Sequence, residues 1–340
     1  MSTLVVSDLH LGSRLRHDVL THPEPLHRLL EALKGVERLV LLGDIVELLE
    51  KRADRAMEEA EPILRGIGQM LRGREVIIVP GNHDRALVAP WLRRIGSGLA
   101  LDSRVPVDAT LELASLTSWL APASVEVHYP GVWLAPGVWA THGHYLDRHL
   151  LPESAYGVTR GLLGRLPQPG ATPIDYERAG RLSVTRLEAM VIKALPRPLA
   201  ALAEDLAELI RASTMPLAPR RLLHPGMARF TAGVLGTQMR RASLPALSHV
   251  VGRLGIDADW VLFGHVHRLG PLAGDLERRW CGPRGRPRLL NTGSWVYEPL
   301  LVHNAIAPHP YWPGGAAILE DGRPPRAVGL LDGVAASAMH

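Results

Sequence analysis

The stretch Leu4-Val5-Val6-Ser7-Asp8-Leu9-His10 joins a short apolar run directly to polar residues that can bind ligands. A run of this length beside turn-forming residues is typical of a buried strand. The arrangement recurs downstream, where residues 38–42 lead to Gly43-Asp44 and residues 76–79 lead to Gly81-Asn82-His83-Asp84. In open α/β sheets, ligands bind at the carboxyl ends of the strands. These three segments therefore predict both the fold class and the sheet edge that carries a site.

Helical patterns separate these strands, over about residues 25–34 and 53–71. Alternating strands and helices indicate βαβ units and an α/β layer fold. Further strands are expected in the strand-rich segment 125–141, at 260–263 and at 289–295. The Asp321-Gly322 turn between two apolar runs predicts a closing hairpin.

The segment from about 150 to 256 differs in character from the rest of the chain. It has helical periodicity interrupted by prolines, recurrent arginines and one apolar helical face that runs from Leu199 to Ile210. With 340 residues, the chain is long for one domain and short for three. We therefore expect a catalytic core formed by 1–149 and 257–340, and a helical insertion or cap formed by 150–256.

The net charge and the cysteine content indicate which kind of partner to expect and in which cellular compartment the protein resides. The net charge of +4 is modest, and no dense basic stripe is visible, which disfavours nucleic acid as the partner. Cys281 is the single cysteine, so a disulfide framework within the chain and a cysteine-based metal site are excluded. The N-terminal residues do not resemble a secretory leader, and there is no apolar run long enough to span a bilayer. We expect a cytoplasmic protein, with peripheral membrane contact left open.

The polar residues at the strand ends are of the kinds that bind metal ions. Residues i and i+2 of an extended chain point the same way, so Asp8 and His10 are expected to meet one ion. His265 and His267 repeat this spacing. Imidazole and carboxylate ligands suit first-row divalent ions, and the donors suffice for two ions bridged by a carboxylate. Manganese is our first choice, with iron, zinc, nickel and cobalt as alternatives.

Simpler interpretations exist for each residue taken singly. Any one of the histidines could be a hydrogen-bonded core residue, and Asp44 could cap a following helix. Glu47 could either support the site or be solvated. The coincidence of the histidines with Asp8, Asp44 and Asn82 at strand ends favours the metal site.

Five motifs together resemble the calcineurin-like metallophosphoesterases, over about residues 1–149 and 257–335. In chain order they are Asp8-Leu9-His10, Gly43-Asp44, Gly81-Asn82-His83-Asp84, His142-Gly143-His144 and Gly264-His265-Val266-His267. The resemblance implies a four-layer sandwich, in which helices flank two mixed β-sheets, with a helical cap.

The resemblance also implies a role for each motif residue. Asp8, His10 and His267 would bind the first ion. Asn82, His142 and His265 would bind the second, and Asp44 would bridge both. His83 would protonate or stabilise the leaving oxygen, and Asp84 would orient His83. His142 is preferred to His144 as the ligand, which leaves His144 to contact substrate, together with Arg14 in the loop after the first motif.

The reaction implied is hydrolysis of a phosphoester or pyrophosphate bond by a hydroxide that bridges two metal ions. The opening Ser7-Asp8-Leu9-His10-Leu11-Gly12 resembles the branch that includes UDP-diacylglucosamine pyrophosphohydrolases, which favours a nucleotide- or lipid-linked phosphate as substrate. Alternatives are a phosphatase or phosphodiesterase for small phosphomonoesters or cyclic nucleotides, a DNA-repair nuclease of the same superfamily, and a non-catalytic scaffold that binds protein partners. Because every ligand position is filled, we favour the enzyme.

Overall fold

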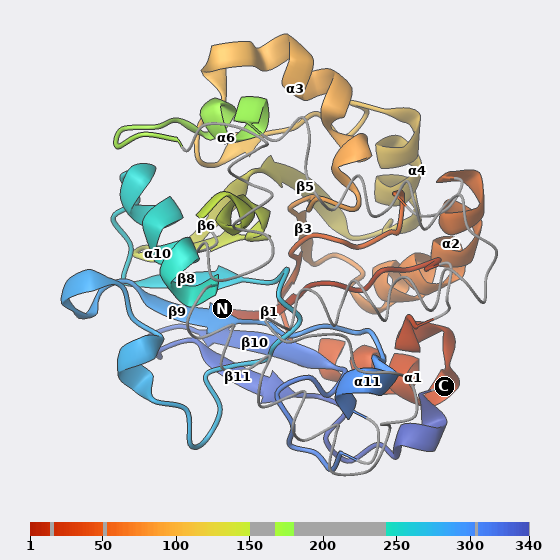
Figure 1. Cartoon of the computed structure of the whole chain (residues 1–340). Coiled ribbons are helices and arrows are strands. Elements are labelled where there is room, and N and C mark those ends of the chain that lie inside the picture. Colours follow the sequence, from red (N-terminus) through yellow and green to blue (C-terminus); the bar gives the residue numbers. More distant parts are fainter. Residues whose placement is uncertain (14–16, 50–52, 150–166, 180–242, 303–304, 340) are drawn as a thin grey trace, which may run out of the picture.

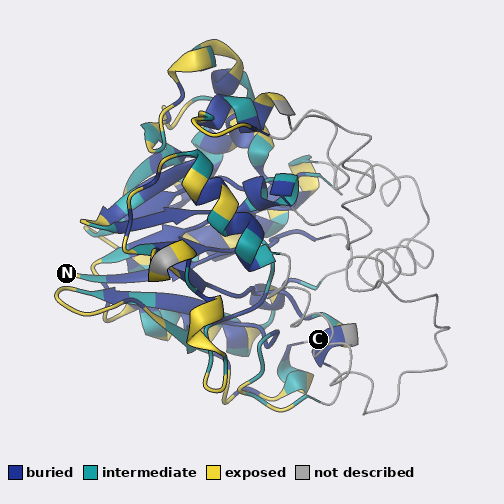
Figure 2. Ribbon diagram, turned by 60° about the vertical axis from the view of Figure 1, so that its left-hand side comes forward, coloured by how far each residue is buried: buried dark blue, intermediate teal, exposed yellow. Residues whose placement is uncertain are grey.

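The computed structural model describes residues 1–13, 17–49, 53–149, 167–179, 243–302 and 305–339. Two β-sheets lie face to face in the middle of the fold, and helices lie on their outer faces (Figure 1). Buried residues are concentrated in the strands, whereas exposed residues lie in connecting loops and on the outer sides of helices (Figure 2).

The larger sheet has seven strands in the order β11-β10-β1-β2-β3-β5-β4. The pairs β1–β2, β2–β3 and β3–β5 are parallel, whereas β1–β10, β10–β11 and β4–β5 are antiparallel, so the sheet is mixed. Its strands are β1 (Ser2–Val6), β2 (Arg38–Leu41), β3 (Glu75–Ile78), β4 (Ser103–Arg104), β5 (Ser124–Tyr129), β10 (Gly315–Glu320) and β11 (Arg326–Gly329).

The smaller sheet has the order β6-β7-β8-β9 and is also mixed, since β6–β7 is antiparallel and the other two pairs are parallel. Its strands are β6 (Gly131–Ala135), β7 (Val138–Thr141), β8 (Trp260–Phe263) and β9 (Arg288–Asn291). Pairing of β7 with β8 brings together residues that are far apart in the chain.

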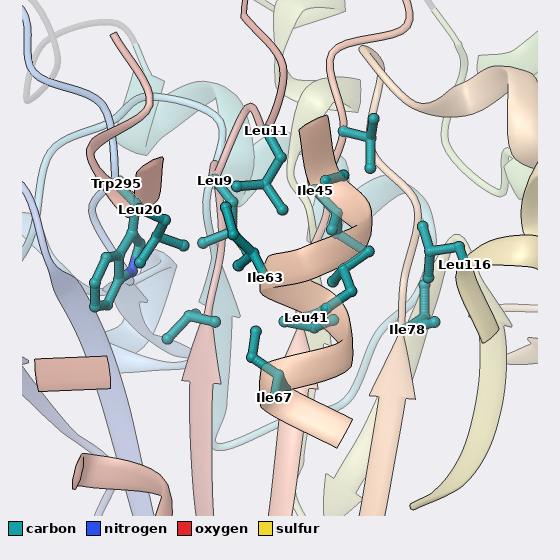
Figure 3. Close-up of a cluster of buried hydrophobic side chains, with 14 of the residues drawn as sticks. Leu9, Leu11, Leu20, Leu41, Ile45, Ile63, Ile67, Ile78, Leu116 and Trp295 are labelled. Carbon is teal, nitrogen blue, oxygen red and sulfur yellow. The ribbon is translucent and has the colours of Figure 1, made fainter. Parts of the chain in front are cut away.

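Each face of the two sheets is covered by apolar side chains. Val40 and Ile77 of the larger sheet meet Val132 and Leu262 of the smaller sheet in the layer between them. On the outer face of the larger sheet, α2 (Ala53–Met70) places Ile63 and Ile67, one turn apart, in the cluster that contains Leu41 (Figure 3). Burial of each such isoleucine contributes about 2 kcal/mol.

The remaining helices complete the outer layers. On the larger sheet lie α1 (Pro23–Leu33) and α4 (Leu111–Trp119), whose apolar residues join the same cluster as α2. On the smaller sheet, α10 (Leu244–Arg253) packs with residues of β7, β8 and β9. Shorter helices are α3 (Ala89–Ile95), α6 (Pro173–Ala179) and α11 (Pro299–Val302).

The predicted fold class is confirmed, since two mixed sheets flanked by helices form a four-layer sandwich. The hairpin at Asp321-Gly322 is confirmed as the antiparallel pair β10–β11. The apolar face from Leu199 to Ile210 lies outside the described residues, and the division into core and insertion stays a prediction. Among the described helices, none combines the length and apolar character that a bilayer crossing requires.

Candidate metal centre

The motif residues follow five strands and gather where the two sheets meet. Asp8 and His10 follow β1, Asp44 follows β2, and Asn82 follows β3. From the smaller sheet, His142 follows β7, while His265 and His267 follow β8. Backbone bonds hold the loops together, from the amide of Asp8 to Gly43 O (3.0 Å) and from that of His10 to Asp44 O (2.9 Å).

These loops have an unusual backbone. Five residues other than glycine have positive φ within the described parts of the chain, and all five are predicted ligands: Asp8 (54°), His10 (45°), Asp44 (52°), His265 (70°) and His267 (54°). The left-handed region is costly for such residues, and strain of this kind tends to cluster at functional sites. The expectation of an extended chain at Asp8 and His10 is therefore wrong. The alternative that Asp44 caps a helix is also wrong, because residues 45–49 are not helical.

Glycines allow the ligand loops to approach one another closely. A Cβ atom on Gly81 would lie 2.2 Å from Asp44 Oδ1 and 2.7 Å from His142 Cδ2. A Cβ atom on Gly264 would lie 2.4 Å from Asp8 Oδ2. No side chain fits at these two positions unless the predicted ligands move.

The side chains form two groups of potential ligand atoms, each within 4.8 Å of one another. The first group contains Asp8, His10 and His267, and the second contains Asp44, His142 and His265. Asp44 Oδ2 lies 3.0 Å from His142 Nε2 and 3.8 Å from His10 Nε2, so its carboxylate stands between the groups. A third overlapping group joins Asp44 to His10 and His83.

Hydrogen bonds leave particular nitrogen atoms available to ions. His142 Nδ1 lies 3.0 Å from the carbonyl oxygen of Leu42, which can only accept, so Nδ1 donates to it and Nε2 is the nitrogen that an ion could take in exchange for a proton. His10 Nδ1 bonds to Glu47 Oε2 at 3.0 Å, while its buried Nε2 has no hydrogen-bond partner among the residues that the structure describes. A buried nitrogen without a partner is costly, and a metal ion would satisfy it. The donor set therefore fits two divalent ions.

The electrostatics of the metal-free site agree with this fit. Burial by itself would raise the pKa of Asp44, but His142 and His83 hold that pKa well below its ordinary value. Burial would lower the pKa of His142, but Asp44 raises it to about 9. Buried carboxylates here are balanced by positive charge, and bound cations would supply the same balance.

Two acidic residues, Asp84 and Glu47, lie near His83. The Asp84 carboxylate accepts from the backbone amides of Ile45 (2.7 Å) and Gly81 (2.6 Å), so it ties two ligand loops together. His83 Nδ1 bonds to Glu47 Oε2 at 2.6 Å, and the expectation that Asp84 orients His83 stays a prediction. Burial, and then Asp44, raise the pKa of Asp84 to about 7.

Glu47 is the residue whose role the sequence left undecided. Its side chain is buried, and one oxygen contacts Nδ1 of both His10 (3.0 Å) and His83 (2.6 Å). Its other oxygen accepts from the amide of Leu49 at 2.9 Å. The spacing from Asp44 gives no sign of this bridge, because residues 45–49 follow an irregular path.

The predicted substrate contacts are placed only in part. His144 lies beside the second group but is not a member of it, and its Nε2 lies 3.3 Å from the hydroxyl of Tyr129. Arg14 lies outside the described residues. Asp147, which follows the fourth motif and could by sequence be either a substrate contact or an ordinary surface residue, contacts His265 Nε2 at 2.9 Å.

Comparison with known proteins agrees with this geometry. Residues 1–161 match the model of the calcineurin-like phosphoesterase family. No curated protein matches the chain. Solved structures with some likeness include a dimetal phosphatase from Danio rerio (14% identity, 97% of this chain and 96% of that one, TM-score 0.38). Another is a mutant cold-active protein tyrosine phosphatase (15% identity, 98% and 78% coverage, TM-score 0.29). TM-scores this low add nothing to the assignment.

The sandwich fold and the clustered ligands thus define a metallophosphoesterase, a hydrolase of phosphoester bonds. Residues 1–161 belong to the calcineurin-like phosphoesterase family, as the motifs predicted. The narrower resemblance to UDP-diacylglucosamine pyrophosphohydrolases stays a prediction.

Proposed function

We propose that the chain hydrolyses a phosphoester or pyrophosphate bond in a nucleotide- or lipid-linked substrate, with two divalent metal ions in the candidate centre. The observation that carries this proposal is the position of the Asp44 carboxylate between the Asp8–His10–His267 group and the His142–His265 group. A carboxylate in this position is suited to bridging two ions.

The protein would hold the ions through residues of both sheets. Asp8, His10 and His267 would hold one ion, and Asn82, His142 and His265 the other. Asn82 Oδ1 lies 3.1 Å from His142 Nε2, a distance that supports a shared role for both donors at the second ion. When bound, the two ions would neutralise phosphate charge and lower the pKa of the attacking water, which is the expected source of the hydroxide nucleophile.

His83 is suited to proton transfer. Its Nδ1 faces the Glu47 carboxylate, and its ring lies 4.7 Å from that of His10, centroid to centroid. Its backbone amide donates to Asp44 Oδ1 at 2.8 Å, so its main chain is fixed relative to the bridging carboxylate. Since Glu47 engages Nδ1, we assign Nε2 of His83 as the atom that gives a proton to the leaving oxygen.

The test is a substrate panel with metal-loaded protein. It should cover phosphomonoesters, cyclic nucleotides and nucleoside-diphosphate-linked lipids, with manganese compared with iron, zinc, nickel and cobalt. We expect two metal ions per chain and the highest kcat/KM on a nucleotide- or lipid-linked pyrophosphate. Preference for a phosphomonoester or a cyclic nucleotide would overturn the substrate class.

Variants of the centre test the reaction itself. His10→Ala and Asp44→Asn should lose both metal and activity, whereas His27→Ala and Asp108→Asn, at exposed positions, should retain both. If the parent binds no divalent ion and has no activity on the panel, the scaffold alternative replaces the enzyme. Full activity in His10→Ala would refute the assigned centre.

A further inference from the structure

A buried carboxylate outside the metal centre collects hydrogen bonds from three residues of the core. Glu177 lies on α6, and 9% of its surface is exposed. Its Oε2 accepts from Nε of Arg85 at 2.8 Å and from Nη2 of the same side chain. Its Oε1 accepts from the hydroxyl of Tyr145 at 2.8 Å and from that of Tyr129.

The neighbouring residue reinforces this contact of α6 with the core. Tyr176 stacks on Tyr145 with ring centroids 4.8 Å apart and an interplanar angle of 12°. The Tyr176 hydroxyl lies 2.8 Å from His149 Nε2. Segment 173–179 is therefore docked by a stacked ring and a paired charge, which is the arrangement that a buried carboxylate requires.

The direction of each hydrogen bond follows from the chemistry of the groups. The Arg85 guanidinium can only donate, and the Glu177 carboxylate that faces it accepts. Burial, and then Glu177, hold the pKa of both Tyr129 and Tyr145 well above the ordinary value, so both phenols keep their protons and donate them. Tyr129 has one proton, and it is given to Glu177.

The consequence reaches His144, whose Nε2 lies 3.3 Å from the Tyr129 hydroxyl. Because that hydroxyl has no second proton, its oxygen accepts from His144, and Nε2 of His144 must carry the hydrogen. Nδ1 is then the unprotonated nitrogen, and it is buried without a hydrogen-bond partner in the described part of the chain. His144 thus presents an acceptor beside the rings of His142 and His265, with centroids at 5.7 and 6.5 Å.

We propose that Glu177 is a positioning residue that docks segment 173–179 on the core and, through Tyr129, holds His144 with its proton on Nε2 and its Nδ1 open as an acceptor. The part of this proposal that concerns catalysis rests on the proposed function. The part that concerns the tautomer of His144 depends only on the hydrogen bonds described above.

The substitution Glu177→Gln distinguishes this arrangement from simple packing. Its carbonyl would turn to Arg85, and its amide group would then donate to the Tyr129 oxygen. The Tyr129 hydroxyl would be left to donate to His144 Nε2, so the tautomer of His144 would invert to Nδ1–H. In Tyr129→Phe, Nε2 would lose its acceptor and both tautomers would be populated. Tyr145→Phe is the matched control, since it removes one hydroxyl from the same carboxylate oxygen and keeps the ring, through which Tyr145 contacts His144.

The tautomer can be read from ¹⁵N shifts and long-range ¹H–¹⁵N couplings of the imidazole nitrogens in the full chain, metal-free and zinc-loaded, with His144→Gln to assign the signals. We expect Nε2–H in the parent and in Tyr145→Phe, inversion in Glu177→Gln and a mixture in Tyr129→Phe. The proposal would be overturned if His144 kept the parent tautomer in both Glu177→Gln and Tyr129→Phe. It would also be overturned if the tautomer changed equally in Tyr145→Phe. If Glu177→Gln does not fold, the proposal is decided by comparing the His144 tautomer in Tyr129→Phe with that in Tyr145→Phe.

Activity provides the second readout. In the metal-loaded enzyme we expect kcat to fall about ten-fold in Glu177→Gln and Tyr129→Phe, in the range of other residues that orient groups at metal sites. An inverted tautomer with unchanged kcat would overturn the role in catalysis. Because the NMR measurement needs neither substrate nor metal, an inactive parent protein would count against the proposed function and not against the hydrogen-bond assignment.

Discussion

Substitution of Glu47 by glutamine should weaken two parts of the candidate centre at once. One carboxylate oxygen contacts Nδ1 of both His10 (3.0 Å) and His83 (2.6 Å), and the amide of Leu49 fixes the other oxygen at 2.9 Å. Burial by itself would raise the pKa of Glu47, but the charge of His83 and the hydrogen bond with His10 lower that pKa to about 2. Glutamine keeps the shape of the side chain and removes the charge, so the hydrogen-bond contribution can be isolated.

The magnitude follows from the two bonds. A hydrogen bond to a charged group contributes about 1 kcal/mol more than a neutral one, so the loss of charge at two bonds costs about 2 kcal/mol, or roughly 30-fold. The part that acts through His10 should appear in metal affinity. The part that acts through His83 should appear in kcat at saturating metal.

The assay is kcat and KM at saturating manganese, together with calorimetric titration of the metal. Glu112→Gln, on the exposed side of α4, is the matched control. In a His83→Gln background, Glu47→Gln should lose its effect on kcat and keep its effect on metal affinity. If Glu47→Gln retains parental kcat and metal affinity, the bridging role is refuted.

Three further predictions concern a glycine between the ligand loops, the effect of metal removal on thermal stability, and the dependence of stability on pH. Gly81→Ala should abolish stoichiometric metal binding, because its Cβ atom would lie 2.2 Å from Asp44 Oδ1. Gly35→Ala is the matched control, since Gly35 has no atoms within 4 Å of the added Cβ and, like Gly81, is not at positive φ; equal metal content in the two variants would contradict the prediction. Chelation should lower Tm and re-addition should restore it, since ions that bind only the folded state stabilise it; a Tm independent of metal would count against the centre. Burial, and then Arg268, lower the pKa of His309 below 6.5 in the folded chain. The unfolded chain therefore binds this proton more readily, so stability should fall as pH drops below about 6.5. In urea unfolding of metal-free protein, His309→Asn should flatten that slope, and an unchanged slope would exclude His309 as the source.

The sequence by itself determined the strands and the place of the site. The run from Leu4 to Val6 and the segment 260–263 form strands, because short apolar runs bounded by turn residues have few other ways to be buried. Since carboxyl ends of parallel strands share an edge, the residues that follow these strands were expected to meet, and they lie together.

Only the tertiary structure decided how each group is held. The positive φ of Asp8 and His10 arises where loops from two sheets press together, and no local pattern encodes it. Glu47 reaches His83, and Glu177 reaches Arg85, across separations of 36 and 92 residues. Such contacts depend on the packing of the sheets and of α6 on the core, whereas spacing along a chain reports only on neighbours within a turn or a strand.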